Sequence, residues 1–231
     1  MLPGNERDAR ATAGRRALWL AQLLRPQVSH VVAFGVTLIG PLDTNRLVGA
    51  TQAVLDRVGW RDVHIPPEFS PADPDRTSPF RPAGTGCAVV DLVDLTDAPD
   101  PVAAGAARAD AFIDSVDGAD LTKPLWRSEL HTVGPQVQHW IVRVHHVLTD
   151  GAGAWRVMGH IADVYGGTAR ADDLRVPHDA DIDRADAQYQ HSARHDADAS
   201  YWTVCWPSTN RRCSPVSRQN RPLTSPGSRR A

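Results

Sequence analysis

The 231-residue sequence predicts an α/β fold, an α+β two-layer sandwich in which helices cover a sheet. Two observations predict it. Segments with helical spacing of apolar residues alternate along most of the chain with runs rich in β-branched residues. Two of these runs, 125–133 and 137–144, are separated only by Gly134, Pro135 and Gln136, which is typical of an antiparallel hairpin.

The chain is expected to open with a helix, a strand and a second helix. The first helix spans 13–24 and ends before Pro26. Its apolar stripe is expected to consist of Ala17, Leu18, Leu20, Ala21 and Leu24. The strand covers 29–39 and places Phe34, Val36 and Leu38 on one face. Asp43 is expected to cap the second helix, which extends to about Val58.

The middle of the chain contains an irregular segment, 59–86. Residues 61–85 hold six of the 18 prolines and show no periodicity, so we expect a long surface loop or a disrupted segment outside the core. A strand over 87–95 follows. Asp100 and Pro101 then provide a cap and a first-turn proline for a helix over 102–116.

Composition excludes several classes of protein. The chain has 25 basic and 27 acidic residues and a net charge of -2, whereas nucleic-acid-binding proteins carry a strong basic excess. The longest mostly apolar stretch, 31–42, is interrupted by glycine and proline and is shorter than the roughly 18 residues of a membrane span. Three cysteines without metal-site spacing indicate neither a disulfide framework nor a zinc site. We therefore expect a cytoplasmic protein that binds neither nucleic acid nor membrane.

The last residues differ in composition from the rest. Residues 203–231 contain six arginines and no acidic residue, together with five serines and four prolines. This composition predicts a disordered basic tail. It fits either a basic arm for an acidic partner or out-of-frame translation of GC-rich DNA. We expect a disordered N-terminus over 1–11 and one folded region over 12–202.

A cluster of reactive residues lies between the second hairpin strand and a helix that ends at Gly166–Gly167. The sequence reads His145-His146-Val147-Leu148-Thr149-Asp150-Gly151. An imidazole with a near-neutral pKa can accept a proton from an attacking hydroxyl, thiol or amine. Adjacent strand residues point to opposite faces, so one histidine is expected to be catalytic and the other structural. Asp150 could orient an imidazole or hold the loop through an arginine, and Gly151 would let a backbone N–H approach an oxyanion.

Two other interpretations fit the same residues. Two histidines and an aspartate can bind a metal, but no further ligand lies near this loop, so no metal site is predicted. Alternatively, His145 and His146 are core residues and Asp150 caps the following helix.

The segment 145–151 resembles the His-His-x-x-x-Asp-Gly motif of condensation domains from nonribosomal peptide synthetases. The flanking stretches RRALWLAQLLRP, VTLIGPLDTNRLVGATQAVLDRV and DLTKPLWRSELHTVG are similar to that family's helices and strands in the same order. The similarity covers 12–202, with a gap over 59–86. A shorter His-x-x-x-Asp-Gly motif is shared with chloramphenicol-acetyltransferase-like and wax-ester-synthase-like acyltransferases. The double histidine and the ordered flanks favour the condensation branch.

The resemblance implies the N-terminal lobe of a condensation domain, with a chloramphenicol-acetyltransferase-like fold of a mixed sheet flanked by helices. It implies amide bond formation between acyl and aminoacyl thioesters on the phosphopantetheine arms of peptidyl carrier proteins, alongside adjacent synthetase modules. No cofactor would be bound by the chain itself. Since the second lobe supplies the opposing wall of the substrate tunnel, the chain alone is expected to be inactive. Acylation of a hydroxyl from acyl-CoA or a carrier, and a noncatalytic remnant or carrier-docking module, are the alternative functions.

The resemblance also assigns roles within the motif. His146 corresponds to the residue at the acceptor amine, where it takes a proton or positions the nucleophile. His145 and Asp150 correspond to residues that hold the loop, with Asp150 paired to an arginine. Gly151 corresponds to the glycine whose backbone faces the oxyanion. The family's Arg-His-x-x-Leu-Arg pattern is matched at Arg57 but its second arginine is displaced to Arg61, which leaves the partner of Asp150 open.

Overall fold

The structure is a computed structural model that describes residues 12–69, 80–82, 86, 88–115, 119–175 and 179–205. The chain divides into two compact units, Met1–Gln188 and Tyr189–Ala231. The first contains the sheet and the helices around it. Helix α5 (Asp179–Gln190) spans the division, and the second unit contains α6 (Ala193–Cys205). The N-terminus expected to be disordered, 1–11, and residues 206–231 of the expected tail lie outside the described residues. The expected boundary at residue 202 stays a prediction.

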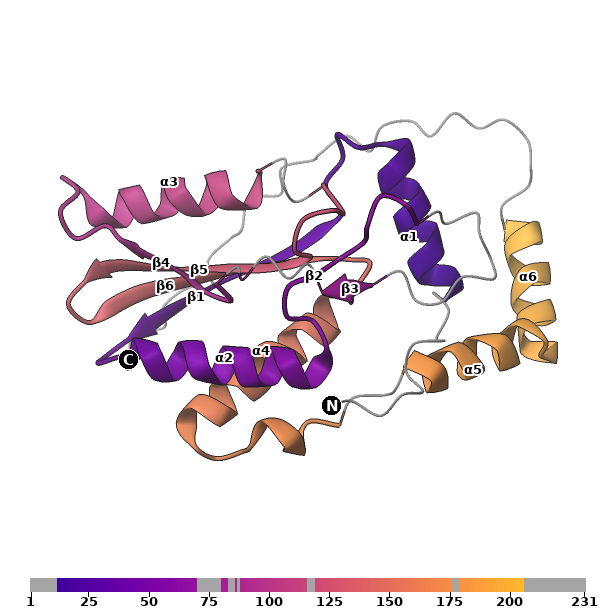
Figure 1. Ribbon diagram of the computed structural model, residues 1–231. Helices are drawn as coiled ribbons and strands as arrows, with labels where there is room; N and C mark the ends of the chain where they lie inside the picture. Colours follow the sequence, from indigo (N-terminus) through magenta and orange to yellow (C-terminus); the bar gives the residue numbers. More distant parts are fainter. Residues whose placement is uncertain are drawn as a thin grey trace, which may run out of the picture. The chain divides into compact units, whose positions relative to one another are not determined.

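The central feature is a four-stranded mixed sheet with the order β1-β6-β5-β4 (Figure 1). Its strands are β1 (Val31–Ile39), β6 (Val137–His145), β5 (Trp126–Gly134) and β4 (Asp91–Asp94). β6 is antiparallel to both β1 and β5, whereas β4 is parallel to β5. The expected hairpin is confirmed as β5–β6. The strand expected over 87–95 is shorter, at 91–94, and Cys87 lies outside the described residues.

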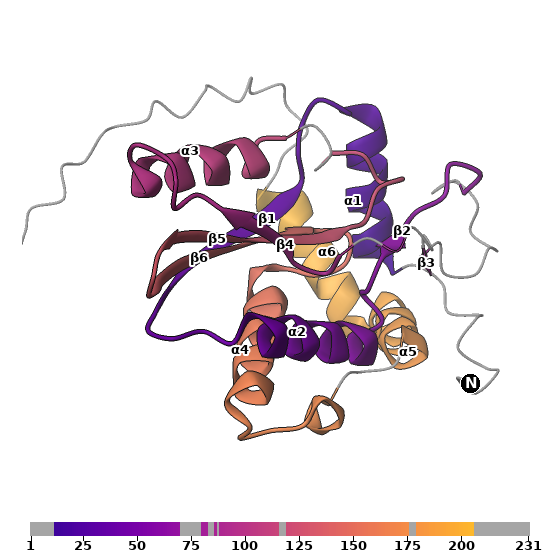
Figure 2. The ribbon, with the colours of Figure 1, turned by 60° about the vertical axis from the view of Figure 1, so that its left-hand side comes forward.

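Helices lie on both faces of this sheet. α2 (Thr44–Val58) and α4 (Gly151–Gly166) cover one face and α3 (Pro101–Ile113) the other (Figures 1 and 2). α2 begins as expected, because the Asp43 carboxylate accepts the Arg46 N–H at 3.0 Å, and it ends at Gly59 with a left-handed φ of 71°. Asp100 caps α3 in the same way, with Pro101 as the first helical residue. The expected α/β fold with a mixed sheet flanked by helices is confirmed.

The main hydrophobic core lies between the sheet and the α2–α4 pair. It contains buried residues from four elements: Leu47, Val54 and Leu55 of α2, Leu130 of β5, Trp140, Val142 and Val144 of β6, and Val157, Met158 and Ile161 of α4. Phe34, Val36 and Leu38 pack against it from β1, as the alternation predicts. Trp155 of α4 is 57% exposed and its ring lies tilted against that of Phe34 at the edge of the core, with ring centroids 5.7 Å apart.

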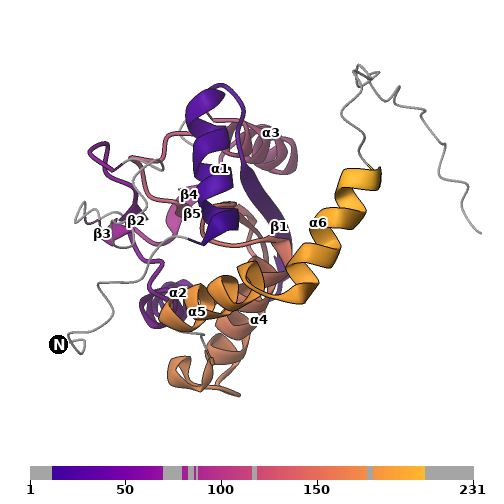
Figure 3. The same ribbon diagram turned by 90° about the vertical axis from the view of Figure 1, so that its right-hand side faces the viewer.

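A second, smaller core supports α1 (Ala13–Leu24), which lies across one end of the sheet (Figures 1 and 3). Its buried members are Trp19, Val63, Ile65, Leu121, Leu125, Val147 and Leu148. The expected stripe of α1 was wrong: α1 buries Trp19 and Gln22, whereas Leu20 is 47% exposed and Leu24 is exposed. The helix turns its Gln22 side inward because that side chain has buried hydrogen-bond partners.

The irregular segment also contributes to the second core, which corrects its expected place outside any core. Val63 and Ile65 are buried, and their backbones are hydrogen-bonded to the segment before β5, through Ile65 N–H to the Leu121 carbonyl and Leu125 N–H to the Val63 carbonyl, both 2.8 Å. β2 (Val63–His64) pairs with β3 (Arg81–Pro82) as a short antiparallel ladder. Two apolar residues just before Pro66 are therefore sufficient to pack this segment.

The sheet face beneath α3 carries a buried polar cluster. Arg108 of α3 donates two hydrogen bonds to the Glu129 carboxylate, at 2.7 and 2.8 Å, and His131 Nε2 lies 2.8 Å from the same carboxylate. Burial would raise the pKa of Glu129, but the hydrogen bonds and charges of these two partners lower it overall. The cluster fixes α3 on the sheet.

Candidate functional site

The His145–Gly151 segment forms a tight turn between β6 and α4. Three backbone hydrogen bonds hold its start: His145 N–H to the Leu125 carbonyl, His146 N–H to the His30 carbonyl, and Leu148 N–H to the His145 carbonyl, at 2.8, 2.8 and 3.0 Å. Val147 and Leu148 are buried in the second core. The turn is therefore fixed to the residues just before β1 and β5 and to the second core.

His145 is locked inside the protein by hydrogen bonds on both ring nitrogens. Nδ1 accepts the Val147 N–H at 3.0 Å, so Nε2 carries the hydrogen and donates it to Gln22 Oε1 at 3.1 Å. Burial, with a smaller contribution from His30 and His146, lowers the pKa of His145 to about 4. This imidazole is neutral at neutral pH and has no free nitrogen for a substrate. One of the two histidines was expected to be structural, and the buried, hydrogen-bonded ring of His145 fits that role.

His146 lies in a different environment. Its side chain is partly exposed, and no hydrogen bond to its ring nitrogens is found in the part of the chain that the structure describes. The chain leaves β6 after His145, so the two adjacent imidazoles are separated into a buried and an accessible one. Of the two imidazoles, that of His146 is the one accessible to solvent.

Asp150 acts as the N-cap of α4. Its Oδ1 accepts the Gly153 N–H at 2.8 Å and its backbone carbonyl accepts the Ala154 N–H at 3.0 Å. The side chain is exposed, and no ion pair for it occurs among the described residues. Arg61 instead pairs with Asp56, with Nε 2.6 Å from Oδ1. The sequence left two roles open for Asp150, a helix cap and the partner of an arginine. Among the described residues, the structure shows the cap.

The two glycines in the first turn of α4 have different surroundings. A Cβ at Gly151 would meet no atom within 4 Å, whereas one at Gly153 would overlap Thr149 Oγ1 and lie 3.3 Å from Asp150 Oδ1. The N–H of Gly151, the first residue of α4, is one of the N–H groups that have no partner within the helix. A side chain at Gly153, but not at Gly151, would therefore displace the Thr149 hydroxyl.

A cavity of about 260 Å³ borders the turn. Leu148, Thr149 and Gly153 line it from the turn, and Trp60, Arg15 and Arg156 line it from neighbouring elements. The cavity therefore places cationic groups near the motif. Within the described residues, no group of three or more histidine, cysteine, aspartate or glutamate side chains is arranged to hold a metal ion. No helix of the described segments is long and apolar enough to cross a membrane.

Two residues important to this geometry were not identified from the sequence. Gln22 holds His145, and Gly153 allows Thr149 to sit against α4. A polar residue four positions after Leu18 in an amphipathic helix was the only signal for Gln22, and it is a weak one because such residues usually lie at the edge of the stripe. Nothing in the sequence distinguished Gly153 from Gly151.

Comparisons with known proteins agree with the resemblance of the motif. No protein-family model matches the chain. The isonitrile lipopeptide synthase of Streptomyces coeruleorubidus is 28% identical over 197 residues, which is 82% of this chain and 13% of the synthase. The starter condensation domain of the rhizomide synthetase, solved with C8-CoA and Leu-SNAC, is 26% identical with a TM-score of 0.71, covering 92% of this chain and 48% of that one.

A further structural match supports the fold alone. The first condensation domain of the calcium-dependent antibiotic synthetase is 22% identical with a TM-score of 0.69, covering 88% of this chain and 48% of that one. The chain thus spans about half the length of the condensation domains it matches. The expected resemblance to condensation domains of nonribosomal peptide synthetases is confirmed.

Proposed function

We propose that this chain, whose fold is that of about half a condensation domain, is the motif-bearing N-terminal lobe of an enzyme that forms amide bonds in nonribosomal peptide synthesis. The observation that carries the proposal is the separation of the two histidines. His145 is buried and hydrogen-bonded on both nitrogens, and His146 beside it is partly exposed. One residue builds the turn and leaves the other for a substrate.

The proposed reaction joins an acyl thioester to the amine of an aminoacyl thioester. The amine nitrogen attacks the thioester carbonyl carbon, the C–S bond breaks, and the proton lost by the amine is returned to the leaving thiolate. His146 is the proposed group at the acceptor amine, where it accepts this proton or orients the nitrogen. The Gly151 N–H at the start of α4 is the proposed donor to the carbonyl oxygen as charge develops on it.

The substrates are proposed to arrive on phosphopantetheine arms of peptidyl carrier proteins in adjacent synthetase modules, in the cytoplasm. A fatty acyl group is favoured as the donor, because the curated relative is a lipopeptide synthase and the rhizomide starter domain was solved with C8-CoA. A second lobe completes the site, since the motif turn forms only one wall. The chain by itself is therefore expected to turn over slowly or not at all.

A chimera tests the proposal directly. The matching half of the rhizomide starter condensation domain is replaced by residues 12–202, and C8-CoA and Leu-SNAC are supplied as substrates. We expect N-octanoyl-leucyl-SNAC, formed with release of CoA and detected by mass spectrometry, and its loss in the His146→Ala chimera. His146→Gln separates the two roles, because glutamine orients an amine through a hydrogen bond but transfers no proton at neutral pH.

The matched control is His30→Ala, which removes a neighbouring imidazole and keeps the backbone carbonyl that accepts the His146 N–H. Circular dichroism confirms that each chimera is folded. Unchanged product formation by the folded His146→Ala chimera would exclude His146 from the reaction.

A further inference from the structure

β1 forms one edge of the sheet, and its outer side presents backbone groups (Figures 1 and 2). β1 pairs with β6 in regular register over nine consecutive residues. Bonds from the His146 N–H to the His30 carbonyl and from the Gly40 N–H to the Gln136 carbonyl continue this ladder at its two ends. The even-numbered residues of β1 therefore bond to β6. The odd-numbered residues direct their N–H and carbonyl groups outward, and these are Val31, Ala33, Gly35, Thr37 and Ile39.

The outward groups of β1 have no hydrogen-bond partner among the described residues. Edge strands usually avoid pairing with other chains through short length, charged residues, proline or bulges. The opposite edge strand, β4, has four residues and carries Asp91 and Asp94. β1 has nine residues and contains neither a charged residue nor a proline. One edge of the sheet is thus protected by length and charge, and the other is not.

The edge of β1 is complementary to a second copy of itself. In an antiparallel ladder, two opposite residues exchange both of their backbone bonds, so an outward residue must face an outward residue. A two-fold axis at Gly35 meets this condition over the whole strand. Ala33 then faces Thr37 of the second copy. Val31 faces Ile39 at each end, and about ten backbone hydrogen bonds form between the two strands.

The same register brings apolar side chains together on the face that carries the main core. Phe34 lies opposite Val36 of the second copy, and both side chains are only partly buried in a single chain. Val32 lies opposite Leu38. Trp155, which is 57% exposed, packs against Phe34 beside this edge. Pairing therefore extends the core across the junction, and each apolar contact removes surface from water.

We propose that two copies of this chain associate through antiparallel pairing of their β1 strands, centred on Gly35, into one continuous sheet. The assembly closes as a two-fold dimer, because each copy uses the same edge and the protected β4 edges remain at the two ends. The proposal is independent of the proposed reaction, since it rests on β1 and its neighbours alone.

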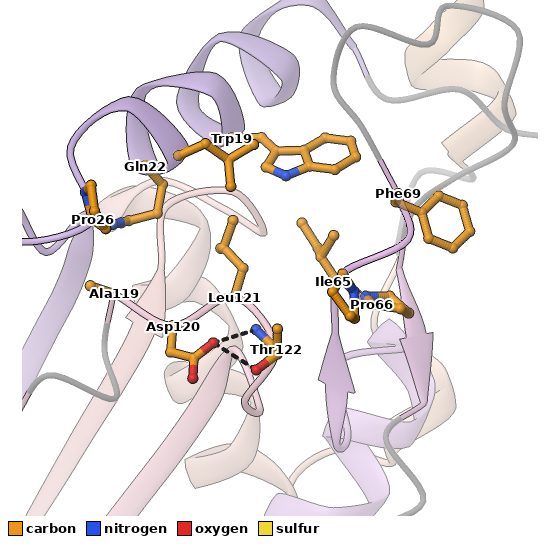
Figure 4. Close-up of a pocket in the computed structure, with 12 residues that line it drawn as sticks. Trp19, Gln22, Pro26, Ile65, Pro66, Phe69, Ala119, Asp120, Leu121 and Thr122 are labelled. Atoms are coloured by element: carbon orange, nitrogen blue, oxygen red, sulfur yellow. Dashed lines mark hydrogen bonds between the residues drawn. The ribbon is translucent and has the colours of Figure 1, made fainter.

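Another exposed apolar surface lies on α1, beside the pocket that Trp19, Ile65 and Leu121 line in Figure 4. Leu23 also lines this pocket and is 53% exposed. This surface offers apolar area but no row of unpaired backbone groups, because the N–H and carbonyl groups within a helix bond to each other. It serves as the rival surface in the test.

The mass of the full chain in solution tests the proposal. Size-exclusion chromatography with light scattering, run over a range of concentrations, should give twice the mass of one chain. Thr37→Pro removes an outward N–H and leaves the bonds to β6 in place, so it should give the mass of a single chain. Thr37→Val keeps the N–H and should stay dimeric. A single-chain mass for the unsubstituted protein at every concentration, or a dimeric Thr37→Pro that is folded by circular dichroism, would overturn the proposal.

Matched charge substitutions locate the interface without altering the backbone. Ile39 of β1 and Leu92 of β4 are exposed aliphatic residues on the two edge strands, at 83% and 59%. Ile39→Lys should weaken dimerisation at least tenfold, whereas Leu92→Lys and Leu23→Glu should leave it unchanged. Dissociation caused by Leu23→Glu but not by Ile39→Lys would place the contact on α1 and refute pairing through β1.

A disulfide tests the register. Opposite residues of a hydrogen-bonded antiparallel pair have Cα atoms about 5.5 Å apart, within the range that a disulfide spans. A Cβ at Gly35 would lie 3.4 Å from Ile141 Cδ1, so a cysteine fits there. With Cys87, Cys205 and Cys213 replaced by serine, Gly35→Cys should give a covalent dimer on mild oxidation, and Leu92→Cys should not. Equal cross-linking of both variants, or none at Gly35→Cys, would contradict the register centred on Gly35.

Discussion

The Nε2 atom of His145 lies 3.1 Å from Oε1 of Gln22, and this hydrogen bond joins the last residue of β6 to the first helix. The same glutamine donates to the Val28 carbonyl in the segment that leads from α1 to β1. One buried side chain therefore connects α1, the entry to β1 and the motif turn. The orientation of His146 depends on a residue more than a hundred positions earlier in the sequence.

Replacing Gln22 by leucine should destabilise the protein. The substitution leaves the buried His145 Nε2–H and the Val28 carbonyl without a partner, and each unsatisfied group costs about 1–3 kcal/mol. Urea denaturation should therefore give a lower free energy of unfolding for Gln22→Leu. Gln27→Leu is the control, because Gln27 is exposed. Equal stabilities of the two variants would show that the hydrogen bond contributes little.

Stability should fall with decreasing pH between about 6.5 and 4. The pKa of His145 is about 4 in the folded protein, below the ordinary histidine value of 6.5, so the unfolded chain binds the proton more readily. The stabilising contribution is complete above pH 6.5 and is lost as the pH falls towards 4, in total on the order of 3 kcal/mol.

The His145→Asn variant isolates this contribution from that of other titrating groups. Its free energy of unfolding should be lower than that of the unsubstituted protein at pH 7, and the difference between the two should shrink as the pH falls to 4. A difference that is constant over this range would mean that His145 titrates normally in the folded protein.

The two glycines of the first turn of α4 should respond differently to alanine. Gly151→Ala adds a methyl group in open space and should change stability by less than about 1 kcal/mol. Gly153→Ala places its methyl group against Thr149 Oγ1 and should cost about 1–3 kcal/mol through displacement of that side chain. Thermal unfolding of both variants measures the difference, and the reverse order of stability would contradict this geometry.

Substitutions of Asp150 distinguish a helix cap from an ion pair. Asp150→Ala removes the acceptor for the Gly153 N–H and should cost about 1 kcal/mol. Asp150→Asn keeps an oxygen at that position and should retain most of the stability, because asparagine is as good an N-cap as aspartate. If asparagine destabilises the chain as much as alanine in denaturant unfolding, then the negative charge of Asp150 has a partner that capping does not explain.

Local sequence determined the elements around the site. The start of α2 at Asp43 and its end at Gly59 follow from capping chemistry, as does the start of α4 at Asp150. The β5–β6 hairpin follows from two β-rich runs joined by a short turn. These features depend on residues within a few positions of each other, so the motif turn could be placed between a strand and a helix from the sequence alone.

Other features were decided only by the tertiary structure. The buried face of α1 is set by Gln22 and Trp19, although Leu20 and Leu24 are more hydrophobic than glutamine. Val63 and Ile65 enter a core from a segment whose prolines indicated a surface loop.

The burial of these residues could not be predicted from the sequence because the groups that they contact come from distant parts of the chain. Gln22 is buried because His145 and the Val28 carbonyl satisfy its amide, and Ile65 is buried because its backbone pairs with Leu121. The sequence by itself determined where the two histidines occur. The assignment of His145 to the interior and His146 to the surface required the packing of α1 against the end of the sheet.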